Sequence, residues 1–195
     1  MRVLGLTGGM GMGKTTVAAF LSRAGFPVFD ADATVRALQA DHGKALPFIA
    51  QLVPETVSDG HLDRGALRRA VVQQPALLRQ LEKIIHPMVW AERTQFLRRH
   101  RQQGARWVVL DIPLLFEAGA WRLCDYIVVV SAPARIQAGR VALRRSITKA
   151  EARRLIARQM PDRQKRRRAD RVIRTGGTVR QTIQQVQSLI RMMKQ

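Results

Sequence analysis

A glycine-rich segment near the start of the chain constrains the fold most. Residues 8–15 read GGMGMGKT and match the pattern G-x-x-x-x-G-K-[ST]. The short apolar run Val3–Leu6 precedes them, and a helix-forming stretch, Lys14–Arg23, follows. Glycines let consecutive backbone N–H groups turn inward around a phosphate, and the following helix adds partial positive charge at its N-terminus. Strand, loop and helix in this order predict a nucleotide phosphate site rather than a glycine turn without a ligand.

Three side chains of this motif have expected roles in phosphoryl transfer. Lys14 is expected to contact the β- and γ-phosphates of ATP, Thr15 to bind Mg²⁺ through its hydroxyl, and Thr16 to contact the α-phosphate. Asp111 ends the apolar run Trp107–Leu110, where a Walker B acid would help to hold the magnesium ion. Capping of the segment that follows is the other role open to Asp111.

Two acids follow the second apolar run of the chain. Val28 and Phe29 form this run, and Asp30 and Asp32 come at its end, where both are expected to point to the same side of the strand. In a parallel sheet this strand end lies beside the glycine loop, where ligands collect. One of the two carboxylates is expected to accept the proton of an attacking hydroxyl or to bind metal-held water. Alternatively, Asp30 or Asp32 only caps the helix that we expect from Ala33.

Apolar runs and helical patterns alternate along most of the chain, which predicts an α/β fold with a parallel sheet of about five strands. The runs Trp107–Leu110 and Tyr126–Val130 are apolar throughout, as in strands with both faces covered, and Asp170–Ile173 is a last short strand. Residues 34–103 show helical spacing without a further convincing strand. We expect a single domain with P-loop connectivity: a core (1–33, 106–134 and 169–195), a helical acceptor-binding insertion (34–105) and an Arg-rich lid (135–168).

Two hydroxyl residues indicate where helices begin in the second half of the chain. Thr148 and Glu151 have the spacing of a capping box, so a break in the helical pattern is expected near residues 146–147. Thr178 is expected to cap a final helix whose apolar residues share one face.

Charge and composition narrow the possible partners. The chain has 34 Lys and Arg against 14 Asp and Glu, a formal net charge of +20, which attracts polyanions. A single cysteine, Cys124, excludes an intramolecular disulfide and a multi-cysteine zinc site. No run of 18 or more apolar residues occurs, so no membrane helix is predicted. We expect a cytoplasmic protein without a membrane partner.

Motifs along almost the whole chain resemble those of the dephospho-CoA kinases, P-loop enzymes that phosphorylate the ribose 3′-hydroxyl of dephospho-coenzyme A. The glycine loop alone indicates only a nucleotide, whereas the full set of motifs is specific. The set consists of LTGGMGMGKTT (6–16), FDAD (29–32) with Arg36, LEKIIHP (81–87), PLLFE (113–117), the pair Arg140 and Arg144, Gln159, and ADRVI (169–173) leading into Gly176.

The resemblance implies an enzyme that transfers a phosphoryl group from ATP to dephospho-CoA with magnesium, giving ADP and CoA in the last step of coenzyme A biosynthesis. It implies that Asp32 is the base for the acceptor hydroxyl, that the helical insertion binds the acceptor, and that the segment around Arg140 is the lid. The residues implied to bind ATP are Gly11, Met12, Gly13, Lys14, Thr15 and Thr16.

Further residues are expected on the acceptor side. The resemblance places Arg36 and His86 there, although a histidine before proline often only ends a helical turn. Pro113 and Leu114 follow a strand at the ligand edge of the sheet, so their backbone is expected to line the acceptor pocket, unless the segment is plain core. Glu117 is too hydrophilic for the core, and either binds a ribose hydroxyl or faces solvent.

The sequence departs from the family pattern at two places. Met12 stands where Ser is common, and Arg174 and Thr175 stand where the family usually has Asn near the glycines. Position 12 is expected to contribute mainly its backbone to the loop. The second departure therefore concerns contacts on the adenine side.

The arginines concentrate in the lid segment. Arg140 and Arg144 have the i, i+4 spacing that places both guanidinium groups on one helix face, where one is expected to pair with the ATP donor and the other with the moving phosphoryl group. Most remaining arginines are expected to form a solvated basic face.

Two other functions are compatible with the glycine loop. One is a P-loop ATPase that binds nucleic acid, but aromatic residues make up only 5% and no base-stacking motif is present. The other is a kinase of another small molecule, which the motifs LEKIIHP and PLLFE disfavour. We expect ATP and dephospho-CoA as partners, no specific nucleic acid, and a monomer.

Overall fold

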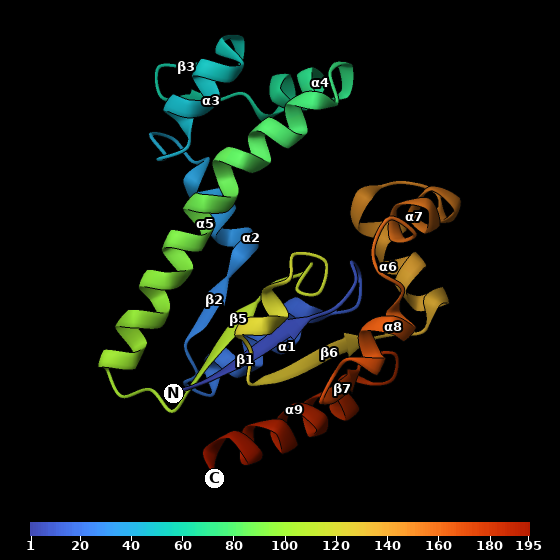
Figure 1. Cartoon of the computed structure of the whole chain (residues 1–195). Coiled ribbons are helices and arrows are strands. Elements are labelled where there is room, and N and C mark those ends of the chain that lie inside the picture. The colour runs from blue at the N-terminus through green and yellow to red at the C-terminus, as the bar shows by residue number, and fades with distance from the viewer. The chain divides into compact units, whose positions relative to one another are not determined.

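The computed structural model describes all 195 residues (Figure 1). The chain divides into two compact units, residues 1–29 with 100–195, and residues 30–99. A five-stranded sheet has the strand order β2-β5-β1-β6-β7, which confirms the predicted α/β fold. Its strands are β1 (Arg2–Thr7), β2 (Val28–Asp30), β5 (Trp107–Asp111), β6 (Tyr126–Ser131) and β7 (Arg171–Arg174). The helices of the first unit are α1 (Lys14–Arg23), the 3₁₀ helix η2 (Ala120–Leu123), α6 (Ala134–Arg145), α7 (Lys149–Ile156), α8 (Asp162–Arg167) and α9 (Val179–Lys194).

The carboxyl ends of the strands meet at one edge of the sheet. β1 pairs in parallel with β5 and β6, and β6 pairs in parallel with β7. In this register Leu6 lies opposite Asp111, and Ser131 lies opposite Arg174. The glycine loop follows β1 directly, so it lies at this edge together with the residues that end the other strands.

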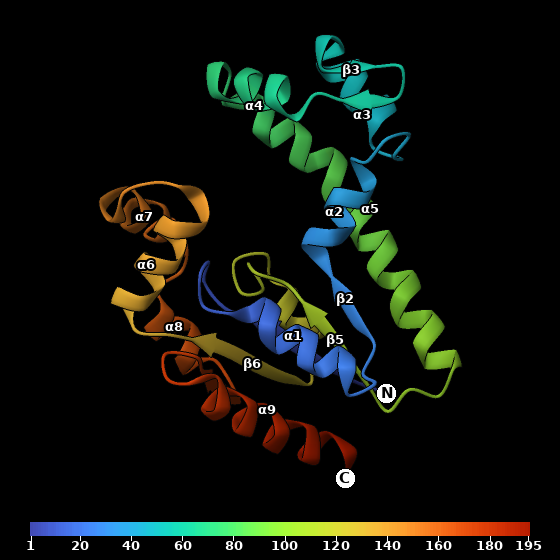
Figure 2. The same cartoon turned by 180° about the vertical axis from the view of Figure 1, so that it is seen from behind.

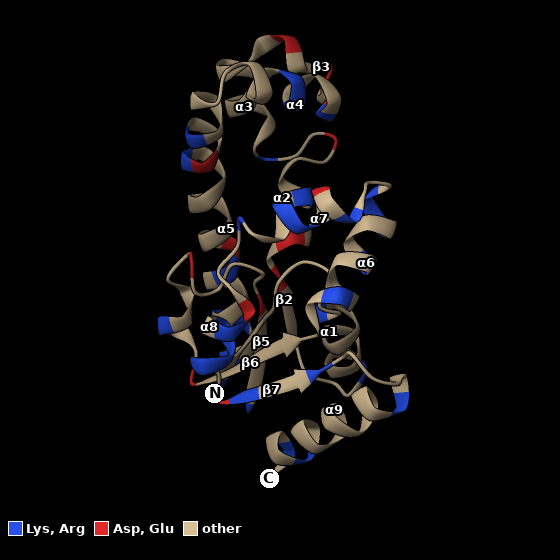
Figure 3. Ribbon diagram, turned by 90° about the vertical axis from the view of Figure 1, so that its right-hand side faces the viewer, with Lys and Arg blue, Asp and Glu red and all other residues tan.

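Both faces of the sheet are covered, as the fully apolar strands predict (Figure 3). Val128 and Val130 of β6 join one core cluster with apolar residues of α1 and α9. Ile127 and Val129, which alternate with them, join a second cluster with Leu115 on the other face. This alternation fixes the register of β6, because a shift by one residue would exchange the two faces.

The lid segment consists of α6, α7 and α8, and α6 and α7 pack on one another (Figure 2). The predicted break between α6 and α7 is confirmed, since Ser146 ends α6 with a left-handed φ of 52°. The predicted capping box is present as well: Thr148 accepts a hydrogen bond from the Glu151 N–H, and the Glu151 carboxylate accepts one from the Thr148 N–H. Thr178 caps α9 in the same way, as predicted.

The second unit is mostly helical, but the prediction that it holds no strand is wrong. A short hairpin joins β3 and β4 through Asp59 and Gly60, which have φ values of 49° and 76°. Asp-Gly is the usual signal for such a turn, whereas strands of two residues are too short to show an apolar pattern. The elements of this unit are α2 (Ala31–Leu38), α3 (Leu46–Leu52), the 3₁₀ helix η1 (Pro54–Thr56), β3 (Val57–Ser58), β4 (His61–Leu62), α4 (Arg64–Gln73) and α5 (Ala76–Gln102).

Helix α5 continues through Pro87, so His86 does not end a helical turn. Leu81 and Ile85 before the proline are buried in the core of this unit, and Met88 after it packs against the same cluster. This packing on both sides of Pro87 outweighs the missing hydrogen bond. No helix of the chain is both long and apolar enough to cross a membrane.

The packing of α9 on the sheet leads to a test of the core. Leu189 is 0% exposed, whereas Leu143 on α6 is 86% exposed. We expect Leu189→Ala to lower the free energy of unfolding by about 2–5 kcal/mol, because it leaves a cavity, and Leu143→Ala to change it by less than about 0.5 kcal/mol. Urea denaturation measures both, and equal losses would contradict this packing.

Candidate functional site

The glycine loop has the backbone geometry that its sequence predicts. Gly11 and Gly13 have φ values of 75° and 86°, in the left-handed region that favours glycine. Gly13 is the N-cap of α1, and no acidic residue lies in the first turn of that helix. The first N–H groups of a helix have no partner within it, so this end of α1 presents free donors and partial positive charge. The loop can therefore bind an anion.

Lys14 and Asp111, which are far apart in sequence, form an ion pair. Lys14 is the first residue of α1, and Asp111 is the last residue of the neighbouring strand β5. The Lys14 Nζ donates to Asp111 Oδ1, and both side chains are largely buried. The structure thus brings together the predicted phosphate-binding cation and the predicted Walker B acid at the edge of the sheet.

The segment Pro113–Glu117, which follows β5, is held by hydrogen bonds at Pro113 and at Glu117. Thr7 Oγ1, at the end of β1, donates to the Pro113 carbonyl oxygen over 2.9 Å. Leu115 and Phe116 are buried in the core, whereas Leu114 is exposed. Leu115 and Phe116 thus belong to the core, whereas the pocket-lining role of Pro113 and Leu114 stays a prediction.

Glu117 ends this segment in a contact that the sequence analysis missed. Its Oε1 accepts from the Nζ of Lys165, at 2.8 Å, and from the Met160 N–H, at 3.1 Å. Lys165 is fully buried on α8, and its Nζ also lies 3.4 Å from the Pro113 carbonyl oxygen. Glu117 therefore does not simply face solvent. No local signal distinguishes Lys165 from the solvated basic residues around it, because its partner lies 48 positions away.

The surroundings of Glu117 lower the pKa of its carboxyl. Burial raises the pKa of the carboxyl, but hydrogen bonds from Lys165 and from the Met160 N–H, together with the charge of Lys165, lower it by more. The pKa therefore lies below its ordinary value. A carboxyl of this kind stabilises the fold above its ordinary pKa and loses that contribution as the pH falls through the lowered value.

Arg140 of α6 contacts the glycine loop. Its guanidinium donates to the Thr175 carbonyl oxygen (2.7 Å), to Thr175 Oγ1 (3.2 Å) and to the Gly11 carbonyl oxygen (3.4 Å). Thr175 Oγ1 in turn donates to the Met12 carbonyl oxygen over 2.6 Å. Arg144, one turn later, is exposed. The lid helix, the loop and the end of β7 thus form one hydrogen-bonded group.

The contribution of Met12 differs from the expectation. Its side chain is buried, and its Sδ accepts a hydrogen bond from the Ala132 N–H at 2.9 Å. Position 12 therefore adds a packed side chain to the loop as well as its backbone. Thr15 and Thr16 are exposed on α1.

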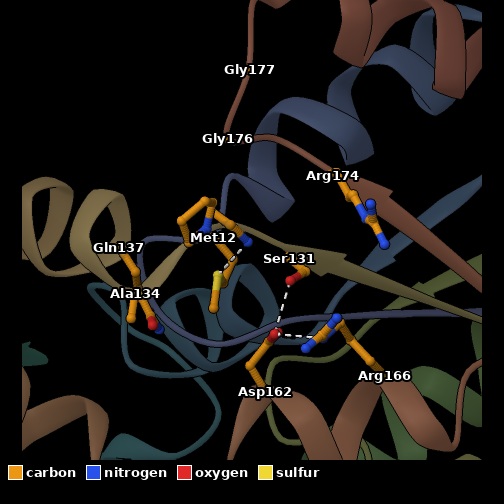
Figure 4. Close-up of a pocket in the computed structure, with 11 residues that line it drawn as sticks. Met12, Ser131, Ala134, Gln137, Asp162, Arg166, Arg174, Gly176 and Gly177 are labelled. Carbon is orange, nitrogen blue, oxygen red and sulfur yellow. Dashed lines mark hydrogen bonds and ion pairs between the residues drawn. The ribbon is translucent and has the colours of Figure 1, made fainter.

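A cavity of about 620 Å³ lies next to the glycine loop (Figure 4). Ser131 Oγ donates to Asp162 Oδ2, which also pairs with Arg166. The volume falls in the range of small-molecule pockets. The lining residues come from the loop, the end of β6, the start of α6, α8 and the turn before α9: Met12, Ser131, Ala132, Pro133, Ala134, Gln137, Asp162, Arg166, Arg174, Gly176 and Gly177.

The two acids after the second strand have different roles in the second unit. Asp30 is the N-cap of α2, and its Oδ1 accepts from the Ala33 N–H over 2.8 Å. Asp32 lies in the first turn of that helix and is exposed. The expectation that both acids sit on a strand and point to one side is therefore wrong, because the helix begins at Ala31. Of the two acids, Asp30 and not Asp32 caps α2.

The other predicted residues of the second unit lie on its helices. Arg36, in the last turn of α2, lies 3.8 Å from a carboxylate oxygen of Asp30. His86 is exposed on α5, and its ring stacks on Trp90, with 6.2 Å between ring centroids.

Comparisons with known proteins agree on one family. A family model described as dephospho-CoA kinase matches residues 2–181. The dephospho-CoA kinase of Gluconobacter oxydans is 51% identical over 100% of this chain and 99% of its own length. A crystal structure from Thermus thermophilus shares 34% identity, with a TM-score of 0.80 over 98% of this chain and 97% of that one. The dephospho-CoA kinase from Campylobacter jejuni has a similar fold, with a TM-score of 0.74 at 20% identity, covering 98% and 96% of the two chains.

The pair of Glu117 and Lys165 can be tested through its pH dependence. We expect Glu117→Gln to lower the free energy of unfolding by about 2–4 kcal/mol at pH 7, because it leaves a buried ammonium group without its anion. The difference from the unmodified protein is expected to shrink as the pH falls below about 4.5, where the unfolded carboxyl becomes protonated, and to vanish below the lowered pKa. Chemical denaturation at a series of pH values measures this. Glu55→Gln, at an exposed site, is the control, and a constant difference at every pH would contradict the pairing.

Proposed function

The chain belongs to the dephospho-CoA kinase family, and from this membership we propose how its residues transfer a phosphoryl group from ATP to the 3′-hydroxyl of dephospho-CoA. The observation that supports the proposal most is the glycine loop at the sheet edge, with Lys14 beside Asp111. Phosphoryl transfer needs little covalent chemistry from the protein, so positioning and charge neutralisation supply most of the rate.

On the donor side, the backbone N–H groups of residues 11–16 and the start of α1 bind the phosphates of ATP. Lys14 exchanges its contact with Asp111 for the β- and γ-phosphate oxygens. Arg140 is already held against the loop by Thr175 and Gly11, which supports a role for it in neutralising the phosphates. Arg144 lies one turn further along α6 and reaches the same ligand when the lid closes.

Mg²⁺ accompanies ATP in this proposal. The Thr15 hydroxyl and the Asp111 carboxylate supply the oxygen ligands that Mg²⁺ prefers. The chain has no group of three or more His, Cys, Asp or Glu side chains suited to a metal ion. This fits Mg²⁺, which usually takes one or two protein ligands and completes its shell with water and substrate phosphates. Bound there, the ion would neutralise charge that develops on the transferred group.

On the acceptor side, Asp32 accepts the proton of the attacking hydroxyl. Its exposed carboxylate supports this role, because Asp30 already caps α2 and leaves Asp32 available. Arg36 and His86 bind the acceptor from the second unit, and the backbone of Pro113 and Leu114 lines its pocket. Glu117 contributes by holding Lys165 and the end of that segment.

The surplus positive charge steers phosphorylated substrates toward the site. Long-range attraction of this kind raises association rates and weakens as the salt concentration rises. The low aromatic content, 5%, supports a protein without a specific nucleic-acid partner. We place it in the cytoplasm, as a monomer.

The decisive experiment compares ADP release with ATP alone and with ATP plus dephospho-CoA. We expect release to depend on the acceptor, and mass spectrometry of the product to show one added phosphoryl group. Release at the same rate without acceptor would contradict the kinase assignment, and a panel of other hydroxyl acceptors tests the specificity.

Lys14→Ala tests the donor site. We expect turnover to fall by about 100-fold or more with the fold intact, because a positive charge on the transferred phosphate is lost. Steady-state kinetics and thermal unfolding measure the two properties separately. Lys149→Ala, at an exposed lysine of α7, is the control and keeps its turnover. Near-normal turnover of a folded Lys14→Ala variant would overturn the assignment of the loop.

Asp30 and Asp32 provide a matched pair for testing the base. We expect Asp32→Asn to lower kcat far more than it raises either KM, because a base acts mainly in the transition state. Asp30→Ala is expected to lower the free energy of unfolding by about 1 kcal/mol, because it removes the cap of α2. Kinetics and urea denaturation of both variants distinguish these roles. An Asp32→Asn variant that keeps its kcat would overturn the proposed role.

A further inference from the structure

Met10 of the glycine loop is hydrogen-bonded by lid glutamines at both its backbone N–H and its carbonyl oxygen. The Met10 N–H donates to Gln159 Oε1 over 2.9 Å. The Met10 carbonyl oxygen accepts from Gln137 Nε2 over 3.0 Å. The orientation of each side-chain amide is thereby fixed, since an N–H needs an oxygen partner and a carbonyl needs a donor.

The two glutamines come from separate parts of the lid segment. Gln137 lies in the first turn of α6, and Gln159 lies between the end of α7 and the start of α8. Gln137 is only 5% exposed and lines the cavity beside Met12 (Figure 4). The start of α6 and the segment after α7 are thus joined to one residue of the loop.

Gly9 gives independent support for this contact. A Cβ at position 9 would lie 3.0 Å from Gln137 Nε2 and 3.4 Å from Gln159 Oε1. The phosphate-loop pattern leaves this position free, so phosphate binding alone does not require a glycine there. The close approach of the two glutamines favours glycine there, because a Cβ would press on both side-chain amides.

We propose that Gln137 and Gln159 are positioning residues that fix the backbone N–H and carbonyl of Met10 and anchor the start of α6 and the segment after α7 to the phosphate loop. This rests on the proposed function, in which the loop binds the phosphates of ATP. The Met10 carbonyl oxygen and the Gly11 N–H belong to one planar peptide group, so the bond from Gln137 sets the direction in which the Gly11 N–H points. Gly11 then turns the loop with a positive φ.

The first test measures hydrogen exchange of the Met10 N–H, without nucleotide or acceptor. Amide hydrogen exchange is followed by NMR in the unmodified enzyme and in Gln159→Met and Gln137→Met, which keep the volume of each side chain and remove its polar group. We expect Met10 exchange to speed up roughly tenfold in Gln159→Met, because the N–H loses its partner, and to change by less than about threefold in Gln137→Met. Equal exchange in all three proteins would overturn the proposal.

The second test uses two variants with the same added charge. Gln159→Glu keeps an oxygen acceptor for the Met10 N–H, whereas Gln137→Glu replaces a donor by an acceptor opposite the Met10 carbonyl. We expect Gln137→Glu to weaken ATP binding roughly tenfold more than Gln159→Glu does, although both place one negative charge beside Met10. Calorimetric titration with ATP measures the Kd, and thermal unfolding shows whether each variant is folded.

The controls separate this proposal from the proposed function. Gln164→Glu adds the same charge at an exposed position of α8 and reports the effect of charge alone. Equal Kd values for Gln137→Glu and Gln159→Glu would overturn the proposal. If Gln137→Glu fails to fold, the exchange experiment with the two methionine variants tests the proposal instead. An enzyme that fails to phosphorylate dephospho-CoA would contradict the proposed function, yet the Met10 exchange rates would still report the role of the glutamines.

Discussion

To bind a phosphate, the backbone of the glycine loop must turn several N–H groups toward one point. Many residues around the loop hold its backbone in place through hydrogen bonds. A chain segment with left-handed residues and few side chains has little packing of its own, so its shape depends on its surroundings. In this structure the surroundings are the lid and the strand ends. Gln137, Gln159 and Arg140 bond the loop from the lid, and Thr175 bonds it from the end of β7. The phosphate-binding geometry is therefore a tertiary property as much as a local one.

The same region shows how a chain with a net charge of +20 places charge in its interior. Lys14 is paired with Asp111, and the fully buried Lys165 is paired with Glu117. A buried ammonium without an anion costs much more than a paired one, so each buried lysine needs its acid. The two pairs differ in their expected use. In the proposed function the Lys14 contact opens when phosphates bind, whereas the Lys165 contact also involves the Pro113 carbonyl oxygen and holds a turn in place.

Local signals made the sheet, the loop and the helix caps predictable. The residues 8–15, the apolar strands and Thr148 with Glu151 each act on neighbours within a few positions, so the sequence alone displays them. The expectations were wrong for the hairpin, whose two-residue strands show no apolar pattern, and for the first residue of α2. The pairing of Glu117 with Lys165 joins residues 48 positions apart, and no periodicity in the sequence marks it. The donor-side residues and the acceptor-side residues were grouped by resemblance, and their shared role in the reaction stays a prediction.

The two departures from the family pattern are best understood together. Met12 and Thr175 lie far apart in sequence, but the Thr175 hydroxyl donates to the Met12 carbonyl oxygen, and the Met12 sulfur accepts from the Ala132 N–H. A Cβ at Gly13 would lie 3.3 Å from the same threonine oxygen, so Thr175 packs closely against the turn that begins α1. Thr175 thus packs against the loop, and the buried side chain of Met12 lies in the adjoining space. The contact indicates that the two positions act as one unit, in which a buried methionine and a threonine hydroxyl together support the glycine loop.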